Sequence, residues 1–226
     1  MDAIWIWSIV LLVPAIVLGI YAQAKVSSSF NHYSQIPSAR GLTGAQAARL
    51  VLDSAGLSDV GIEVAGSRLS DHYDPRTRML TLSHEVGNNN SLAAVGVAAH
   101  EAGHAMQHAD GYAALRLRSA LVPVANIGTN FGFILFFVGL IFYRSGILMN
   151  IGILLYSAAV LFTLVTLPVE FNASRRAMAQ LENRSILVGE ELSGAKKVLS
   201  AAALTYVAAA LMAILQLVRL ILISRR

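Results

Sequence analysis

The 226-residue sequence contains no cysteine. A disulfide framework is therefore excluded, and so is any site in which a thiolate binds a metal ion or attacks a substrate. A metal ion in this protein must be held by histidine and carboxylate side chains. The lack of cysteine also agrees with a reducing compartment.

Charged residues are scarce as well. Asp, Glu, Lys and Arg make up 13% of the chain, compared with about 25% in a typical soluble domain. Hydrophobic residues make up 56% and are concentrated in four runs, residues 4–21, 121–143, 147–169 and 201–218. Each run is close to the roughly 20 residues needed to cross a bilayer. The pattern predicts an integral membrane α-helical protein with about four transmembrane helices. The first run has no basic start and no clear cleavage site, so it is predicted to be retained rather than removed as a signal peptide.

Positive charge is concentrated in two polar segments. Of the 17 Lys and Arg residues, 13 lie in residues 23–119 and 169–200. Because positive charge near span ends favours the cytoplasmic side, both segments are predicted to be cytoplasmic, in a multi-pass protein of the cell (inner or plasma) membrane. Arg219 and the two terminal arginines favour the opposite orientation for the last span. The net charge of +4 is therefore interpreted as a membrane-surface feature and not as a nucleic-acid footprint.

The chain is predicted to alternate between spans and polar segments. The predicted transmembrane helices are residues 1–22, 120–143, 147–169 and 201–223, and the polar segments are residues 23–119 and 170–200. Together the polar residues suffice for one small α+β domain attached to a helical membrane bundle. Its predicted helices run from a Thr43 cap to Gly56 and from a Ser91 cap to about Ala109, its strands are residues 61–66 and 78–83, and its loops are residues 23–40 and 84–90.

The second predicted helix contains the sequence HEAGH, in which His100 and His104 are four residues apart. Residues at this spacing share one helix face, about 6 Å apart along the axis. Both imidazoles can therefore bind one ion, and Glu101 can take a proton from a water molecule beside it, as in the HExxH pattern of metalloproteases. A helix with incidental histidines is the alternative, but the small apolar flanks predict burial, and buried histidines need partners. Gly103, unfavourable inside a helix, predicts the close approach of another backbone.

A catalytic zinc site needs three protein ligands and an open position. His108 lies about 12 Å along the helix axis from His100, too far to share one ion. Glu170 lies where the third hydrophobic run ends, a place where a carboxylate is unfavourable unless a positive group neutralises it. It is the candidate third ligand, and a salt bridge to Arg175 or Arg176 at the membrane edge is the alternative explanation.

The stretch AAHEAGHAMQH, preceded by SDHYDP and LTLS and followed far downstream by VEFNASRRA, resembles the YugP-type neutral zinc metallopeptidases. These membrane zinc proteases are similar to the HtpX and CAAX prenyl-protein endopeptidases. The resemblance covers nearly the whole chain, including the order of span, polar domain, two spans, polar segment and span. It implies a small zincin-like α+β catalytic domain, predicted to be cytoplasmic, and Zn²⁺ as the cofactor.

The resemblance also implies roles for single residues. In the HtpX-like proteins the third zinc ligand is the Glu of an E-F-x-A-D pattern, which corresponds to Glu170 in this sequence. Ser174 stands where that pattern has an Asp, so the carboxylate that supports the metal ligands is missing. Asn172 and Asp71 remain as candidates for orienting the histidines.

The implied reaction is the hydrolysis of peptide bonds in membrane proteins or hydrophobic peptides, so the expected partners are such substrates and the lipid bilayer. The candidate site comprises Glu101 as the catalytic base and His100, His104 and Glu170 as metal ligands. His72 and Tyr73 are candidate catalytic residues that stabilise the oxyanion, with a simple turn role as the alternative. The strand-like stretch MLTLS (79–83) is a candidate edge strand for pairing with an extended substrate, with a core strand as the alternative.

Two other functions are compatible with the sequence. The first is a zinc-binding but proteolytically inactive membrane scaffold or adaptor. The second is a small transporter in which Asn126, Thr129 and Asn130 line a polar path. For these three residues, hydrogen bonding between helices of the bundle is the alternative explanation.

Overall fold

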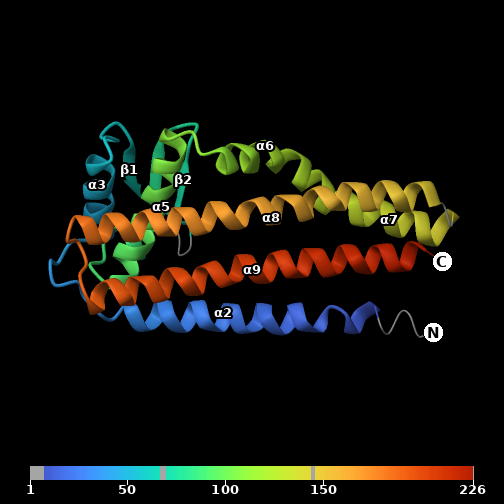
Figure 1. Cartoon of the computed structure of the whole chain (residues 1–226), viewed down its shortest axis with the longest axis horizontal. Helices are drawn as coiled ribbons and strands as arrows, with labels where there is room; N and C mark the ends of the chain where they lie inside the picture. Colours follow the sequence, from blue (N-terminus) through green and yellow to red (C-terminus); the bar gives the residue numbers. More distant parts are fainter. Residues whose placement is uncertain (1–7, 67–69, 144–145, 226) are drawn as a thin grey trace. The chain divides into compact units, whose positions relative to one another are not determined.

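A computed structural model of the chain describes residues 8–66, 70–143 and 146–225 (Figure 1). Residues 1–7, with which the first predicted span begins, lie outside the described part. The chain forms two compact units. The first comprises residues 1–23, 116–168 and 204–226, and the second comprises residues 24–115 and 169–203.

Four helices are long and apolar enough to cross a membrane, which agrees with the four hydrophobic runs. They are Ser8–Tyr33, Ala113–Phe142, Gly146–Asn183 and Glu190–Ser224. Within them lie α2 (Val13–Tyr33), α6 (Ala113–Ile127), η1 (Gly128–Gly132), α7 (Phe133–Val138), η2 (Gly139–Tyr143), α8 (Gly146–Asn183) and α9 (Glu190–Ser224), where η marks a π-helical turn. All four helices continue beyond their hydrophobic runs into polar sequence.

The prediction of a loop over residues 23–40 is wrong for its first part. Helix α2 continues to Tyr33, because the polar stretch QAKVSSSFNHY contains neither glycine nor proline to stop it. The helix ends shortly before Pro37, whose fixed backbone angle cannot continue it. Beyond the helix, Pro37 forms an isolated bridge with Ser91, the residue that caps the HEAGH helix.

The second unit contains the small α+β arrangement that the sequence predicts. Its elements are α3 (Gly44–Ser54), β1 (Gly61–Val64), β2 (His72–Asp74), β3 (Met79–Leu82), α4 (His84–Gly87) and α5 (Leu92–Ala109). The caps at Thr43 and Ser91 are confirmed, since each side-chain oxygen accepts a hydrogen bond from a backbone N–H of the first turn. Strand β2 and the single turn α4 were not predicted, because both are too short to show a period.

The three strands form one sheet in the order β1-β3-β2. Strand β1 runs parallel to β3, and β2 runs antiparallel to it. The prediction that MLTLS is an edge strand is therefore wrong, because β3 is paired on both sides. Leu80 and Leu82 of this strand are completely buried, so β3 is a core strand.

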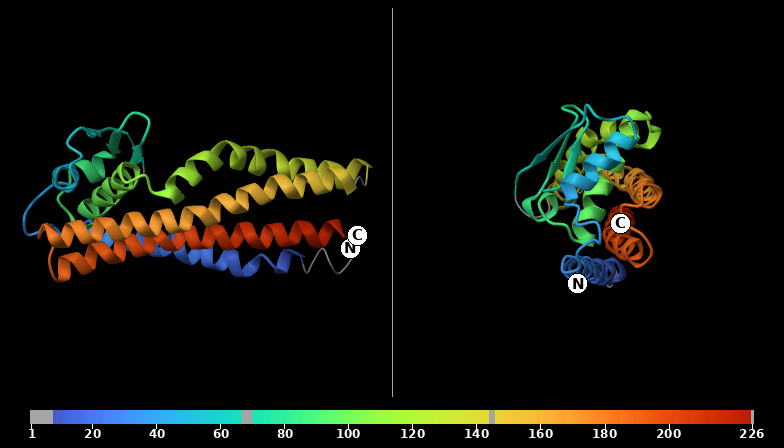
Figure 2. Two further views of the ribbon diagram at one scale, coloured as in Figure 1. Left: turned by 45° about the horizontal axis from the view of Figure 1, so that its top comes forward. Right: turned by 90° about the vertical axis from the view of Figure 1, so that its left-hand side faces the viewer.

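Helix α5 lies in the middle of the second unit and contacts α3, β2 and β3. Its small residues, among them Ala98, Ala99 and Ala102, are completely buried. Figure 2 shows the strands and α3 on one side of α5 and the polar ends of α8 and α9 on the other. A Cβ atom on Gly96 would lie 3.3 Å from the Ala195 side chain of α9. The HEAGH helix is therefore packed on both sides.

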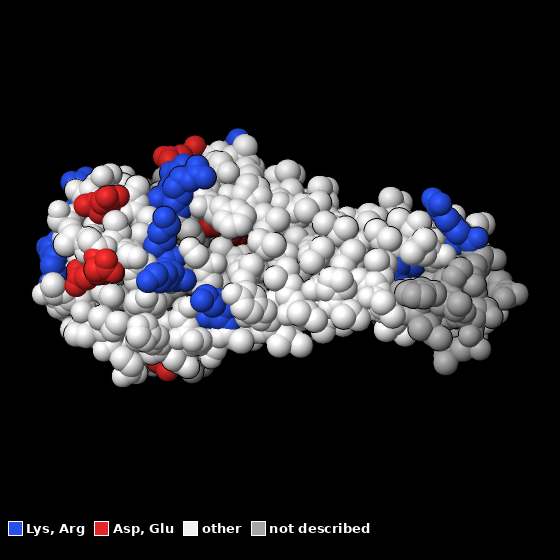
Figure 3. Space-filling view, turned by 60° about the horizontal axis from the view of Figure 1, so that its bottom comes forward, with Lys and Arg blue, Asp and Glu red and all other residues white. Residues whose placement is uncertain are grey.

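The described part of the first unit consists of the hydrophobic parts of the four long helices. Charged side chains gather on the second unit, whereas the visible surface of the first is nearly free of them except near its end (Figure 3). Asn126, Thr129 and Asn130 are exposed on this unit, and the Thr129 hydroxyl donates to the Ala125 carbonyl within its own helix. Their outward position argues against a polar path inside the bundle.

Candidate metal centre

Helix α5 places His100 and His104 on one face. Their ring centroids are 4.8 Å apart, with the rings nearly perpendicular. The helix begins where Ser91 Oγ accepts from Ala94 N at 3.2 Å, and it ends at Asp110, before Gly111 in a left-handed conformation. The two histidines therefore lie well inside a helix that is capped at its start.

A close helix crossing brings α8 to this face. A Cβ atom on Gly103 would lie 2.5 Å from the carbonyl oxygen of Ala173 in α8, a separation that no side chain allows. The predicted close approach at Gly103 is thus confirmed. Since Ser174 follows Ala173 and Glu170 lies about one turn before it on α8, the same crossing brings their side chains to the two histidines.

The imidazoles of α5 and the carboxylate of α8 converge on one point. Glu170 Oε2 lies 3.3 Å from His100 Nε2 and 3.7 Å from His104 Nε2, and the three ligand atoms all lie within 4.8 Å of one another. Ligands bound at about 2.0–2.2 Å around a tetrahedral zinc ion are separated by roughly 3.3–3.5 Å. The Glu170 side chain is only 3% exposed. Two imidazoles and one buried carboxylate are a donor set that suits zinc, and the two distances from Glu170 Oε2 to the imidazole nitrogens are close to the ligand separations of such a site.

The outer nitrogens of the two histidines are held by polar side chains. His100 Nδ1 lies 3.0 Å from Ser174 Oγ, and His104 Nδ1 lies 3.0 Å from Gln107 Oε1. Ser174, which stands where the HtpX-like pattern has an Asp, therefore contacts a histidine directly. Both Nε2 atoms face Glu170.

The two residues expected to orient the histidines lie elsewhere. Asp71 accepts hydrogen bonds from the backbone N–H and the hydroxyl of Ser83, at 2.7 Å and 3.0 Å. Asn172 accepts from Gln107 Nε2 at 2.9 Å and therefore acts one step away from His104. Gln107 was missed in the sequence, although its place three residues after His104 puts it on a neighbouring position of the same helix face.

Glu101 follows the first histidine and is partly exposed. Burial of its carboxyl group raises its pKa, an effect that the nearby imidazoles of His100 and His104 oppose and the carboxylates of Glu170 and Asp71 reinforce. A carboxyl group with a raised pKa is better suited to accept a proton and to return it.

The two candidate oxyanion residues lie on β2, which contacts α5. The His72 ring nitrogen Nδ1 is 2.7 Å from the Ser70 carbonyl oxygen. Tyr73 Oη is 2.9 Å from Nδ1 of His108, one turn beyond His104. His108 thus pairs with a phenol, and the structure brings neither His72 nor Tyr73 into the group formed by the three candidate ligands.

The two arginines considered as partners of Glu170 lie beyond it on α8. Arg175 is exposed. Arg176 forms an ion pair with Asp110 and donates from Nε to Asn172 Oδ1 at 2.8 Å. Arg176 is therefore part of a network that joins α8 to the end of α5.

Comparisons with known proteins agree with this geometry. Residues 8–225 match the family described as "Putative neutral zinc metallopeptidase". The chain is 46% identical over 215 residues to "Putative membrane protease YugP" of Bacillus subtilis (strain 168), and the match covers 95% of each chain. No solved structure matches the chain significantly. With zinc as the metal of the family and a His/His/Glu group to hold it, the chain belongs to these neutral zinc metallopeptidases.

Proposed function

We propose that the protein is a membrane-bound zinc metalloendopeptidase that hydrolyses peptide bonds of membrane proteins or hydrophobic peptides. The observation that carries this proposal is the convergence of His100, His104 and Glu170 on one point, directly beside Glu101. The family match and the similarity to a membrane protease support it.

The proposal assigns a role to each residue of the centre. His100, His104 and Glu170 would hold the zinc ion through Nε2, Nε2 and Oε2. When bound, zinc supplies the Lewis-acid chemistry that activates water and polarises a carbonyl group. Glu101 takes the proton of the attacking water and returns it to the leaving amine.

The second unit is proposed to be a zincin-like catalytic domain on the cytoplasmic side, built from the polar segments 23–119 and 170–200. Strand β2 ends the sheet and contacts α5. An extended substrate segment would therefore pair with the outer edge of β2. Tyr73 on this strand, hydrogen-bonded to His108, is the candidate for contacting the substrate carbonyl.

The test compares the purified full-length protein with its Glu101→Gln variant on casein and on a membrane-protein substrate. The amide cannot act as a base, so we expect the cleavage rate to fall about 100- to 10,000-fold, while bound zinc, measured by metal analysis, stays unchanged. Glu63→Gln is the matched control, because Glu63 is an exposed residue of β1. Equal cleavage by the Glu101→Gln variant and the unaltered protein would exclude the protease and favour the scaffold or adaptor.

A further inference from the structure

We infer that Gln107 is a positioning residue that fixes which nitrogen of His104 carries a proton, and that a chain of side chains from Asp110 through Arg176 and Asn172 holds Gln107 in place. The inference rests on the proposed function, since it concerns one of the three candidate zinc ligands.

Gln107 is completely buried, and its amide group makes three hydrogen bonds. Its Nε2 donates to the Val169 carbonyl at 2.8 Å and to Asn172 Oδ1 at 2.9 Å. Its Oε1 lies 3.0 Å from His104 Nδ1. Both N–H groups and the oxygen are therefore used, as expected for a buried amide.

The chemistry of the partners sets the direction of these bonds. A backbone carbonyl can only accept, so the Gln107 atom that faces Val169 must be the nitrogen. The oxygen then faces His104, and because an amide oxygen can only accept, His104 Nδ1 must carry the hydrogen. The lone pair of the neutral imidazole is thus on Nε2, the atom that faces Glu170 and would bind zinc.

The orientation of Asn172 is fixed in the same way. Arg176 Nε lies 2.8 Å from Asn172 Oδ1, and a guanidinium can only donate. The Asn172 oxygen therefore accepts from both Arg176 and Gln107. Arg176 in turn is paired with Asp110, the residue that ends α5. The chain thus runs from α5 to α8 and back, beside the crossing of the two helices.

His100 differs in this respect. Its Nδ1 contacts the Ser174 hydroxyl at 3.0 Å, and a hydroxyl can either donate or accept. Ser174 therefore does not decide where the His100 proton lies. Of these two contacts, only the one made by Gln107 determines the tautomer.

The first experiment leaves Gln107 and its partners unaltered. Nitrogen-15 NMR of the histidine-labelled full-length protein in detergent, without metal and at a pH where His104 is neutral, reports which ring nitrogen is protonated. We expect a protonated Nδ1 at His104, assigned by comparison with a His104→Gln variant. A protonated Nε2 with a bare Nδ1 would overturn the inference, whether or not the protein binds zinc.

The second experiment measures zinc affinity by competition with a coloured chelator. Replacing Gln107 by methionine, which keeps the length of the side chain but accepts no such bond, should weaken zinc binding about 10- to 100-fold, as the loss of such a partner does elsewhere. Gln180→Met, a half-buried glutamine of α8 hydrogen-bonded to Ser54, is the control and should leave the affinity unchanged.

The outcomes separate this inference from the proposed function. If the unaltered protein binds no zinc, the proposed function fails, while the NMR result still decides the tautomer. If the unaltered protein binds zinc and Gln107→Met binds it equally well, the positioning role is excluded and the metal centre stands. If Gln107→Met does not fold, as shown by its unfolding transition, the decision falls to the NMR result.

Discussion

At the scale of single residues, Glu170 distinguishes a metal centre from a pair of buried histidines. Its carboxylate comes from a different helix than the imidazoles and is 3% exposed. Glu170→Ala removes one of the three proposed ligands, so we expect zinc bound at limiting concentration to be lost, with a decrease in affinity larger than the roughly 10- to 100-fold caused by losing an outer partner. Metal analysis after equilibrium dialysis provides the measurement.

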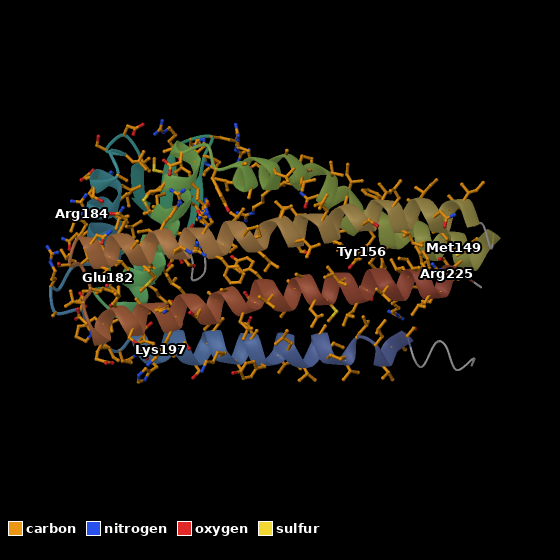
Figure 4. The ribbon with its side chains drawn as sticks, in the orientation of Figure 1. Met149, Tyr156, Glu182, Arg184, Lys197 and Arg225 are labelled. Carbon is orange, nitrogen blue, oxygen red and sulfur yellow. The ribbon has the colours of Figure 1, made fainter. Side chains whose placement is uncertain are left out.

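Glu182→Ala is the matched control for this prediction. Glu182 lies near the end of the same helix, α8, and is exposed (Figure 4). Its replacement should leave the zinc content at the level of the unaltered protein. Undiminished zinc in Glu170→Ala would instead show that the third ligand is another residue.

The sequence reveals the residues of this centre unevenly. The spacing of His100 and His104 on one helix face follows from the helical repeat alone. Glu170 is predictable as a ligand from its unusual place at the end of a hydrophobic run and from the family resemblance. Gln107 and Ser174 contact the histidines only because α5 and α8 cross at one angle and depth, and neither quantity is encoded in local sequence.

At the scale of elements, the crossing of α5 and α8 depends on Gly103. Its missing side chain leaves room for the Ala173 carbonyl, which would lie 2.5 Å from an added Cβ. We expect Gly103→Ala to push the helices apart, lower the free energy of unfolding by about 1–3 kcal/mol and reduce zinc affinity, because Glu170 moves with α8. Thermal unfolding in detergent and chelator competition measure the two effects.

Gly96→Ala tests whether this effect is specific to the crossing. Gly96 lies on the same helix, but its added Cβ would meet the Ala195 side chain of α9 at 3.3 Å, a contact that a small shift relieves. We expect a smaller loss of stability and unchanged zinc affinity. If Gly96→Ala and Gly103→Ala lowered zinc affinity equally, general loosening of the unit would explain both.

The helices were predictable where a long hydrophobic run or a capping residue marks them in the sequence. The four spanning helices, α3 and α5 were all anticipated, since hydrophobic runs and capping residues are local signals. The sequence did not predict that α2 continues to Tyr33, that β2 is a strand, or that β3 lies in the centre of the sheet. A strand of three residues shows no alternation, and the order of strands in a sheet depends on contacts between segments far apart in the chain.

At the scale of the whole molecule, the chain joins a membrane part to a polar part through continuous helices. The chain passes between the two units at four places, two of which are Pro168–Val169, inside α8, and Ala203–Leu204, inside α9. Glu170 therefore lies two residues past Pro168. The proposed third ligand thus follows directly on a hydrophobic run in the sequence, which is the reason to expect hydrophobic substrates for the proposed peptidase.

The polar segments are predicted to lie on the cytoplasmic side of the membrane. Because the sequence lacks cysteine, single cysteines can report it without background. Ser58 is exposed between α3 and β1, and Gly146 is exposed at the start of α8 with no atom near its added Cβ. Since 13 of the 17 basic residues lie in the two polar segments, the positive-inside rule puts Ser58 in the cytoplasm and Gly146 outside.

In intact cells, a membrane-impermeant maleimide should therefore label Gly146→Cys and spare Ser58→Cys, which reacts only after the cells are opened. The reverse pattern would place the metal centre outside the cell.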